Sequence, residues 1–251
     1  MDVIKTNLLT KINFIEHGFF DRNGGESSGV FESLNVGFKT EDDAQNVIRN
    51  REIIAQNFNI PVSNLIILNQ MHGNFVHVID SKNIDQYKFS SQEQSLSIEG
   101  DSIITDQKNL LIGVTTADCA PILLCDPNAK IIAAIHAGWR GATSEIIENT
   151  FEKLKSMNCK YILASIGPCI QGRSFVVTND LAEKVEKRYI SYFNGRTLFD
   201  MQFLILEKLM KLGAKIVSKI NIDTFLNSNF FSCRRQNGQY GVQFSGIMIK
   251  E

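Results

Sequence analysis

Apolar residues along this chain follow two spacings, one typical of helices and the other of strands. Over 41–59, 143–157 and 200–212 they recur every three or four positions, which predicts amphipathic helices. A further helix is expected to begin at Asn179 or Asp180 and to carry Leu181, Val185 and Tyr189 on one face. Short apolar runs predict strands at Leu65–Leu68, Phe75–Asp80, Ser102–Thr105, Leu110–Thr115, Ala120–Cys125, Ile131–Ile135, Tyr161–Ile166, Lys215–Ile222 and Val242–Ile249.

Two of these strands, Ala120–Cys125 and Ile131–Ile135, are almost wholly apolar and are separated by turn residues at 126–128. Runs of this length between turn residues are typical of strands buried on both faces, and the short turn predicts a hairpin. Cys119 lies just before the first strand and His136 just after the second. Because antiparallel pairing brings these ends together, we expect the thiol and the imidazole to lie side by side.

The remaining segments bear on the fold class. Leu65–Leu68 and Phe75–Asp80 flank a turn and predict a second hairpin with His72 at its tip, whereas 81–100 is polar and loop-like and 1–40 is rich in turn residues. Helices mix with adjacent hairpins, and neither a repeat nor a linker is visible. This pattern favours a mixed-sheet α/β sandwich with helices packed on the sheets, over a regular parallel array. We expect residues 1–251 to form a single domain.

Composition excludes several classes of protein. The chain has 26 basic and 27 acidic residues, so no excess charge suggests a nucleic-acid partner or an acidic membrane surface. No apolar run approaches the roughly 18 residues of a membrane span, and the N-terminus lacks the pattern of a secretion signal. The five cysteines are widely spaced, which argues against a disulfide framework. We therefore expect a soluble cytoplasmic protein in which most cysteines are small buried apolar residues.

Three residues beside strand ends, His72, Cys119 and His136, have the chemistry of a catalytic zinc site. Such a site takes three ligands from His, Cys and carboxylate and leaves the fourth position to water. Bound zinc lowers the pKa of that water toward about 7, which supplies hydroxide at neutral pH. The spacing by itself is not diagnostic, because a lone Cys or His beside a buried strand is more often a core residue.

Several short motifs follow one another along almost the whole chain. They are Arg22-Asn23-Gly24-Gly25, Ser33-Leu34-Asn35, Asn69-Gln70-Met71-His72-Gly73, Gly100-Asp101, Thr116-Ala117-Asp118-Cys119-Ala120-Pro121, His136-Ala137-Gly138-Trp139-Arg140-Gly141, Ile166-Gly167-Pro168-Cys169-Ile170 and Phe230-Phe231-Ser232-Cys233-Arg234-Arg235. Together they resemble the family of zinc-dependent purine nucleoside phosphorylases once described as laccase-domain or polyphenol oxidoreductase proteins. The Asp-Cys-x-Pro and His-Ala-Gly-Trp-Arg-Gly motifs are the most specific.

The resemblance implies a single α/β domain whose metal site is made by His72, Cys119 and His136. It implies Zn2+ as the cofactor and purine nucleosides and phosphate as partners. The implied reactions are phosphorolysis of adenosine, inosine and methylthioadenosine, and deamination of adenosine. A bacterial branch of the family is associated with editing of peptidoglycan precursors. One motif departs from the family, because Cys233 precedes the double arginine where tyrosine or histidine is common, and no Thr-Gly-Arg follows.

Phosphorolysis requires a group that holds the phosphate, and the planar fork of arginine suits this task. Arg22, Arg140 and Arg234 each stand in a family-like motif and are the candidates, although each could equally form a surface salt bridge. The glycine-rich segment beside Arg22 is either an ordinary loop or a backbone cradle for an anion. Asp118 is a candidate acid, base or orienting group for a ligand histidine, or else it caps a turn.

Three other functions use the same residues. Two histidines and a cysteine are also a blue-copper ligand set, with Met71 as a nearby methionine, so a copper-dependent polyphenol oxidoreductase is a less favoured alternative. A metal-free cysteine hydrolase would use Cys119 as the nucleophile. A metal-stabilised binding module would need no open coordination position. The His-x-Glu and Pro-Cys-x-x-Cys motifs of zinc nucleobase deaminases are absent, so deamination would need other acid and base groups.

Overall fold

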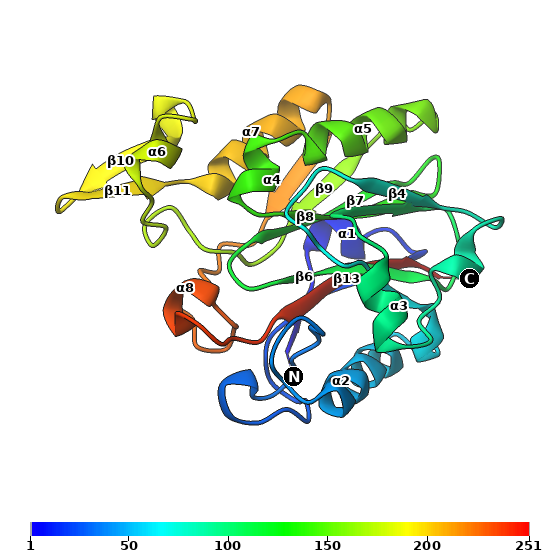
Figure 1. The fold of residues 1–251 in the computed structure, drawn as a ribbon. Coiled ribbons are helices and arrows are strands. Elements are labelled where there is room, and N and C mark those ends of the chain that lie inside the picture. Colours follow the sequence, from blue (N-terminus) through cyan, green and yellow to red (C-terminus); the bar gives the residue numbers. More distant parts are fainter. Residues whose placement is uncertain (1, 251) are drawn as a thin grey trace.

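The computed structural model describes residues 2–250, which fold into stacked layers (Figure 1). A six-stranded sheet has the order β12-β9-β7-β8-β5-β4, and a five-stranded sheet has the order β1-β2-β13-β6-β3. Both sheets mix parallel and antiparallel pairs, so the predicted mixed-sheet α/β sandwich is confirmed. The strands of the two sheets are β1 (Val3–Ile4), β2 (Ile15–Phe20), β3 (Leu65–Ile67), β4 (Val76–Ile79), β5 (Ser102–Thr105), β6 (Leu111–Thr116), β7 (Ala120–Asp126), β8 (Ile131–Ala137), β9 (Leu163–Ile166), β12 (Ile216–Lys219) and β13 (Gln243–Ile249).

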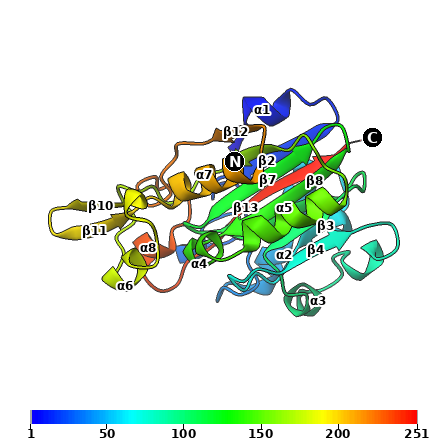
Figure 2. The ribbon, with the colours of Figure 1, turned by 90° about the horizontal axis from the view of Figure 1, so that it is seen from above.

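Helices cover the outer faces of both sheets, and a small two-stranded arm extends from the body in both ribbon views (Figures 1 and 2). The arm consists of β10 (Ile190–Phe193) and β11 (Arg196–Phe199). The helices are α1 (Asn7–Thr10), α2 (Ala44–Asn57), α3 (Gln92–Ser97), α4 (Trp139–Thr143), α5 (Ile146–Ser156), α6 (Asn179–Ala182), α7 (Met201–Leu212) and α8 (Cys233–Gln236). Among the described residues, no helix has the length and apolar character needed to cross a membrane.

Apolar side chains fill three spaces between these layers. Leu123, Ile132 and Ile247 belong to the cluster between the two sheets. The helices α5 and α7 cover the far side of the six-stranded sheet, and α2 covers the far side of the five-stranded sheet. Each central strand therefore packs apolar side chains against the other sheet on one face and against helices on the other. This explains why the sequences of these strands are continuous apolar runs.

Local sequence signals set the ends of the long helices. The carboxylate of Asp43 accepts from the backbone N–H of Gln45 at the start of α2, and that of Asp200 accepts from Phe203 at the start of α7. Gly213, just after α7, has a φ of 104°, a left-handed conformation that glycine adopts without steric cost. The three helices predicted from apolar spacing are therefore present, with trimmed ends.

The central hairpin is also confirmed. β7 and β8 pair antiparallel, with Pro121 opposite His136. At the other end, the Asp126 carboxylate accepts backbone N–H groups of the turn and of the segment before β9, at Asn128, Ala129, Lys160 and Tyr161. This buried carboxylate, with its four donors, fixes the turn. The turn then sets the pairing register of β7 and β8, which places Cys119 and His136 at one edge of the sheet.

The second predicted hairpin is wrong. β3 pairs parallel with β6 in the five-stranded sheet, whereas β4 pairs parallel with β5 in the six-stranded sheet. Residues 68–75 therefore cross from one sheet to the other, and His72 stands on this crossover rather than at a hairpin tip. The turn residues marked a change of direction correctly. Both partner strands come later in the sequence and were themselves predicted, but the local pattern did not indicate these pairings.

Three smaller expectations also differ. The helix predicted to reach Tyr189 ends at Ala182 and is followed by a 3-10 turn at Lys187–Tyr189. The polar segment 81–100 contains α3 and a 3-10 turn rather than loop alone. The turn-rich first 40 residues contain β2, a buried strand paired with β13. Pairing with the distant strand β13 decided β2, whereas α3 has a local cause, because the Ser91 hydroxyl at its start accepts from the Gln94 N–H.

Candidate metal centre and substrate cavity

The three predicted metal ligands converge at one edge of the sheets. His72 comes from the crossover, Cys119 from the residue before β7, and His136 from the end of β8. One nitrogen of each histidine and the Cys119 Sγ all lie within 4.8 Å of one another. The Sγ is 3.8 Å from His72 Nε2. Tetrahedral zinc with bonds of roughly 2.05 Å to nitrogen and 2.3 Å to sulfur would separate those two atoms by about 3.5 Å, so the set fits the ion with only a small adjustment.

Gly138 makes this close approach possible. A Cβ at this position would lie 2.8 Å from the Cys119 Sγ and 3.0 Å from the His72 Cδ2. Both separations are shorter than normal contacts, so any side chain here would push the ligands apart. The close approach of Cys119 and His72 therefore requires a glycine at this position of the His-Ala-Gly-Trp-Arg-Gly motif.

Asp101, immediately before β5, connects two of the ligands. Its Oδ1 accepts from His136 Nδ1 at 2.8 Å and from the His72 backbone N–H at 3.0 Å. Its Oδ2 accepts from the N–H groups of Met71 and Gly73, at 3.2 and 2.8 Å. One buried carboxylate thus fixes the ring of His136 with Nε2 free for a metal, and holds the crossover turn that carries His72.

The electrostatics of this cluster favour a thiolate. Burial by itself would raise the pKa of Cys119, but the charge and hydrogen bonds of His136 and His72 lower that pKa to about 6. Burial would likewise lower the pKa of His136, whereas the Cys119 thiolate and Asp101 raise it to about 9. Without a metal, the two shifts favour a thiolate beside an imidazolium. A bound cation would take the place of the imidazolium proton.

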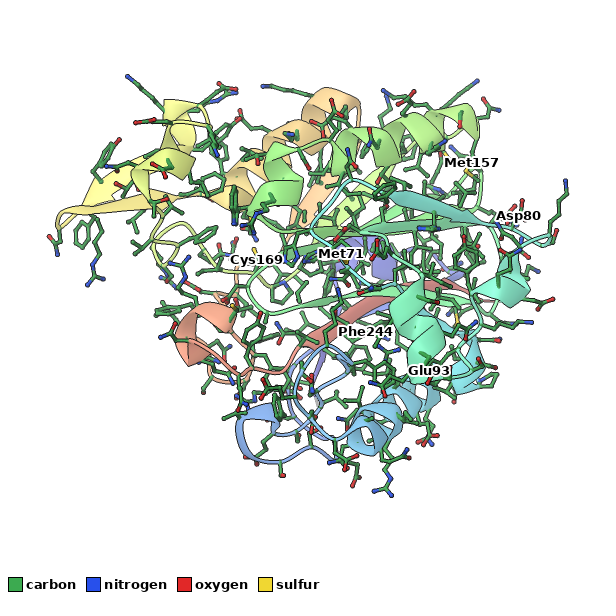
Figure 3. All side chains as sticks on the ribbon, viewed as in Figure 1. Met71, Asp80, Glu93, Met157, Cys169 and Phe244 are labelled. Atoms are coloured by element: carbon green, nitrogen blue, oxygen red, sulfur yellow. The ribbon has the colours of Figure 1, made fainter. Side chains whose placement is uncertain are left out.

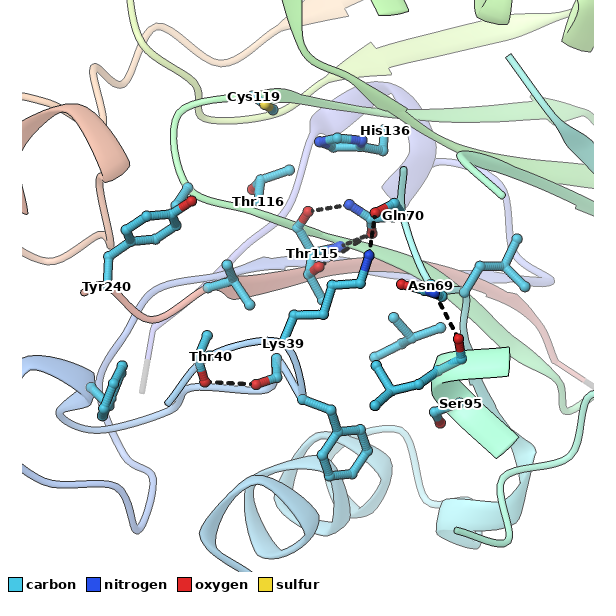
Figure 4. A pocket seen from close by; sticks show the side chains of 18 of the residues that line it. Lys39, Thr40, Asn69, Gln70, Ser95, Thr115, Thr116, Cys119, His136 and Tyr240 are labelled. Carbon is cyan, nitrogen blue, oxygen red and sulfur yellow. Dashed lines mark hydrogen bonds between the residues drawn. The ribbon is translucent and has the colours of Figure 1, made fainter. Parts of the chain in front are cut away.

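The metal ligands open into a cavity of about 510 Å³. Figure 4 shows Cys119 and His136 at one end of it and Ser95 at the other, with the Lys39 side chain between them. Apolar and polar groups share the lining, which includes Phe38, Ile67, Leu68, Leu96, Val242, Lys39, Arg51, Asn69, Gln70, Thr115, Thr116 and Tyr240. A volume of this size with mixed lining suits a small organic ligand that carries polar groups.

Two buried polar atoms in this lining have no hydrogen-bond partner among the described residues. They are the Asn69 Oδ1 and the Thr116 Oγ1. The Asn69 amide is held in place because its Nδ2 donates to Leu96 O at 2.6 Å. A buried polar atom without a partner costs free energy unless a ligand or water meets it. Both residues line the cavity, but these two atoms have almost no accessible surface in this structure and are not ready contacts for a ligand.

The predicted orienting role of Asp118 is not what the structure shows. Its Oδ1 accepts from Thr224 Oγ1 at 2.7 Å, and its Oδ2 accepts from Ser232 Oγ and from the Arg234 N–H, at 2.9 and 2.7 Å. The buried carboxylate thus ties the C-terminal segment to the residue next to Cys119. The carboxylate that orients a ligand histidine is Asp101, whose Gly-Asp motif was visible in the sequence without a role attached.

None of the three predicted phosphate arginines lines the cavity. Arg22 donates to Glu32 O and lies 4.4 Å from the ring of Phe231. Arg234 donates to Val176 O at 2.6 Å, and Arg140 is exposed beside its neighbouring tryptophan. Their proposed role in phosphate binding stays a prediction.

The glycine-rich segment after Arg22 is an ordered loop rather than an open cradle. Its backbone N–H groups at Gly25, Glu26 and Ser27 donate to Ser33 and Asn50. An anion could bind these three N–H groups only by displacing the hydrogen bonds that they already make.

Several cavity residues were missed from the sequence. Lys39 and Arg51 come from the segment before α2 and from α2 itself, and no spacing linked them to the metal ligands. Tyr240, in the divergent C-terminal segment, also lines the cavity, together with Gly238 and Gln239. That segment therefore shapes the cavity although it departs from the family pattern.

Similarity to known proteins covers nearly the whole chain. Purine nucleoside phosphorylase YlmD of Bacillus subtilis is 29% identical over 93% of this chain and 88% of its own length. A purine nucleoside phosphorylase of Corynebacterium glutamicum is 30% identical over 92% of this chain and 93% of its own. Adenosine deaminase RL5, from an unknown prokaryotic organism, is 27% identical over the full length of both.

Solved structures show the same fold. The YfiH protein of Bacillus licheniformis aligns with a TM-score of 0.87 and 25% identity, over 97% of this chain and 96% of its own. YlmD of Geobacillus stearothermophilus has the same TM-score at 24% identity, over 96% and 93%. The model of the family described as multi-copper polyphenol oxidoreductase laccase matches residues 16–250, and the chain belongs to this family.

Proposed function

We propose that this protein is a zinc-dependent purine nucleoside phosphorylase that also deaminates adenosine. The observation that carries the proposal is a Cys-His-His cluster with metal-binding geometry that opens directly into a cavity of about 510 Å³. The names of its relatives, purine nucleoside phosphorylases and an adenosine deaminase, give the substrate class. Adenosine, inosine and methylthioadenosine are the proposed substrates.

Zinc is the proposed metal because the donor set suits it. The Cys119 thiolate and the imidazoles of His72 and His136 would hold the ion, and a three-ligand set of this kind is typical of catalytic zinc. When bound, the ion would supply a Lewis acid and a hydroxide source. The copper alternative needs a weak axial ligand such as a methionine sulfur. Met71 is 47% exposed, and its Sδ lies 3.2 Å from the Lys39 ammonium, so it gives that alternative no support (Figure 3).

The chain's own residues would bind and orient the nucleoside. Phe38 and Leu68 line the cavity and offer apolar surface for the purine. In phosphorolysis, a phosphate oxygen forms a bond to C1′ of the ribose as the C1′–N9 bond breaks, and the base leaves with the electron pair and takes up a proton. In deamination, water adds at C6 and ammonia leaves. Asp118, with three donors already on its carboxylate, would hold the fold of the C-terminal segment rather than transfer protons.

A metal-free cysteine hydrolase is the second candidate, and the Cys119–His136–Asp101 arrangement favours it. The His136 imidazole lies between the thiol and an orienting carboxylate, which is the order of a nucleophile, its base and the group that positions the base. The two candidates differ in whether metal is needed. Hydrolysis of peptidoglycan precursors stays a further prediction for the physiological substrate.

The test combines metal analysis with product analysis. We expect about one zinc per chain in the purified protein, and ribose 1-phosphate and adenine from adenosine only when phosphate is present. Cys119→Ser should remove both zinc and activity, while Cys125→Ser, a matched change at the far end of the same strand, should change neither. Full phosphorolysis after complete removal of metal would overturn the zinc proposal, whereas cleavage that needs Cys119 but neither metal nor phosphate would favour the hydrolase. Copper in place of zinc would favour the oxidoreductase.

A further inference from the structure

Two reactions at one nucleoside need two nucleophiles at different places. Deamination occurs at C6 of the purine, whereas phosphorolysis occurs at C1′ of the ribose, on the opposite side of the base. A phosphate subsite must therefore lie in the same cavity but away from the point where water attacks. Since none of Arg22, Arg140 and Arg234 lines that cavity, the group that would bind phosphate there has to be sought among other residues.

Arg51, on α2, is a buried cation without a countercharge. Its side chain lines the cavity and the residue is only 4% exposed. Of its five N–H donors, Nε meets Val36 O at 3.0 Å and Nη1 meets Ser95 Oγ at 3.1 Å. Within residues 2–250 no carboxylate pairs with it. A buried charge of this kind is costly unless an anion meets it.

The surroundings of Arg51 fix its guanidinium in place. The central carbon lies 4.1 Å from the ring centroid of Phe38 and 5.5 Å from that of Phe89, and these two rings are nearly parallel. Burial lowers the pKa of Arg51 to about 9, so the group is still charged at neutral pH. Aromatic packing and two hydrogen bonds leave the remaining donors in one orientation, which is the condition for a preorganised anion site.

Lys39 adds a second cation to the same cavity. Its ammonium donates to Gln70 O at 3.1 Å and lies beside the Met71 sulfur, and no carboxylate of the described chain pairs with it. Figure 4 shows this side chain extending through the cavity toward Gln70. Among the residues that line the cavity, only Glu41 carries a carboxylate, and its Oε2 accepts from Gln239. Two cationic side chains, Lys39 and Arg51, therefore face a single carboxylate in the described lining.

We propose that Lys39 and Arg51 form an oxyanion subsite that binds the phosphate co-substrate, in the part of the cavity between the metal ligands and Ser95. The inference rests on the proposed function, because it assigns the second substrate of phosphorolysis. A nucleoside with its base toward His72, Cys119 and His136 would direct its ribose toward these cations. Phosphate held there neutralises the uncompensated charge of Arg51 and meets the C1′ side of the substrate.

The test measures phosphate binding directly. Inorganic phosphate is titrated calorimetrically into the zinc-loaded wild-type protein and into Lys39→Met, Arg51→Gln and Arg51→Lys, at constant ionic strength. Loss of a charge-assisted contact should raise the phosphate Kd roughly tenfold to a hundredfold in Lys39→Met and Arg51→Gln, and less in Arg51→Lys, which keeps the charge. The exposed Arg49, two positions earlier on α2, supplies the matched control Arg49→Met, which should bind phosphate like the wild type.

Activity measurements separate this subsite from the proposed function. With adenosine as substrate, the ratio of phosphorolysis to deamination should fall in Lys39→Met by the factor seen in phosphate affinity. Lys39 is exposed, so this variant keeps the test valid if the Arg51 variants fail to fold. The subsite is overturned if Lys39→Met and each folded Arg51 variant bind phosphate as tightly as the wild type and have the same phosphate KM. The phosphorylase proposal would then stay intact. Phosphate binding that depends on these residues in a protein without phosphorolysis would uphold the subsite and overturn the phosphorylase proposal.

Discussion

Asp101 offers the sharpest test of how the metal site is held together. It accepts four hydrogen bonds, two on each oxygen, from His136 Nδ1 and from three consecutive backbone N–H groups at 71–73. In Asp101→Asn one oxygen becomes an NH2 group, which donates and does not accept. Whichever way the amide turns, two of the four bonds are lost and two donors face the new one. The substitution keeps the volume and removes only the charge and half of the acceptors.

The magnitude follows from these contacts. Hydrogen bonds to a charged group contribute about 1.5–3 kcal/mol each, so losing two weakens the site by roughly 3–6 kcal/mol in total. Part of this loss lowers the free energy of unfolding, and part of it loosens the orientation of His72 and His136. Loss of the partner of a ligand histidine typically lowers metal affinity about 10- to 100-fold. We therefore expect Asp101→Asn to lose stability and to bind zinc at least about tenfold more weakly.

Zinc affinity would be measured by competition with a chromophoric chelator, and stability by urea unfolding of the same metal-free samples. Asp126→Asn is the matched control, since Asp126 is also a buried carboxylate with four backbone donors but lies at the opposite end of the β7–β8 hairpin. It should cost stability and leave zinc affinity unchanged. If Asp101→Asn behaves in the same way as this control, Asp101 is a structural cap and not a group that positions the metal ligands.

Three further predictions test other parts of the molecule. Gly138→Ala places a Cβ 2.8 Å from the Cys119 Sγ. Overpacking of this kind costs roughly 1–3 kcal/mol, so zinc should bind about tenfold more weakly in the same chelator assay. Unchanged affinity would contradict the steric role of the glycine. Cys125→Ala should leave the zinc content unchanged, because six residues of strand separate Cys125 from Cys119 by about 20 Å. A loss of zinc in metal analysis would mean that this cysteine reaches the site. His17 is buried and its Nε2 accepts from the Thr6 backbone N–H at 2.9 Å, so burial lowers its pKa from 6.5 to about 4 and the folded state binds fewer protons than the unfolded chain. The contribution of His17 to the free energy of unfolding is then fully present above pH 6.5 and is lost as the pH falls toward 4, with a loss of about 2 kcal/mol by pH 5. Urea unfolding at pH 7.5 and pH 5 should show this loss in the wild type and not in His17→Gln.

Much of the site could be predicted from the sequence because its strongest signals are local. The β7–β8 hairpin follows from two apolar runs and a short turn, and antiparallel pairing then brings Cys119 and His136 together whatever the rest of the chain does. The long helices follow from apolar spacing and their capping residues. Motifs in a fixed order identified the family without any knowledge of the fold.

Tertiary structure decided what local spacing does not encode. Parallel pairing joins strands that are distant in sequence, so the crossover that carries His72 looked like a hairpin turn until β3 and β4 were seen in different sheets. Asp101 gained its role only when β5 was placed beside β8, which brought its carboxylate to the ligand ring. Arg51 looks like an ordinary arginine of an amphipathic helix, and only burial among Phe38, Phe89 and the cavity wall makes its charge an uncompensated one. The sequence by itself identified the three residues of the candidate metal site. Long-range packing decided which groups orient them and which charges face the cavity, since burial and charge pairing depend on neighbours far away along the chain.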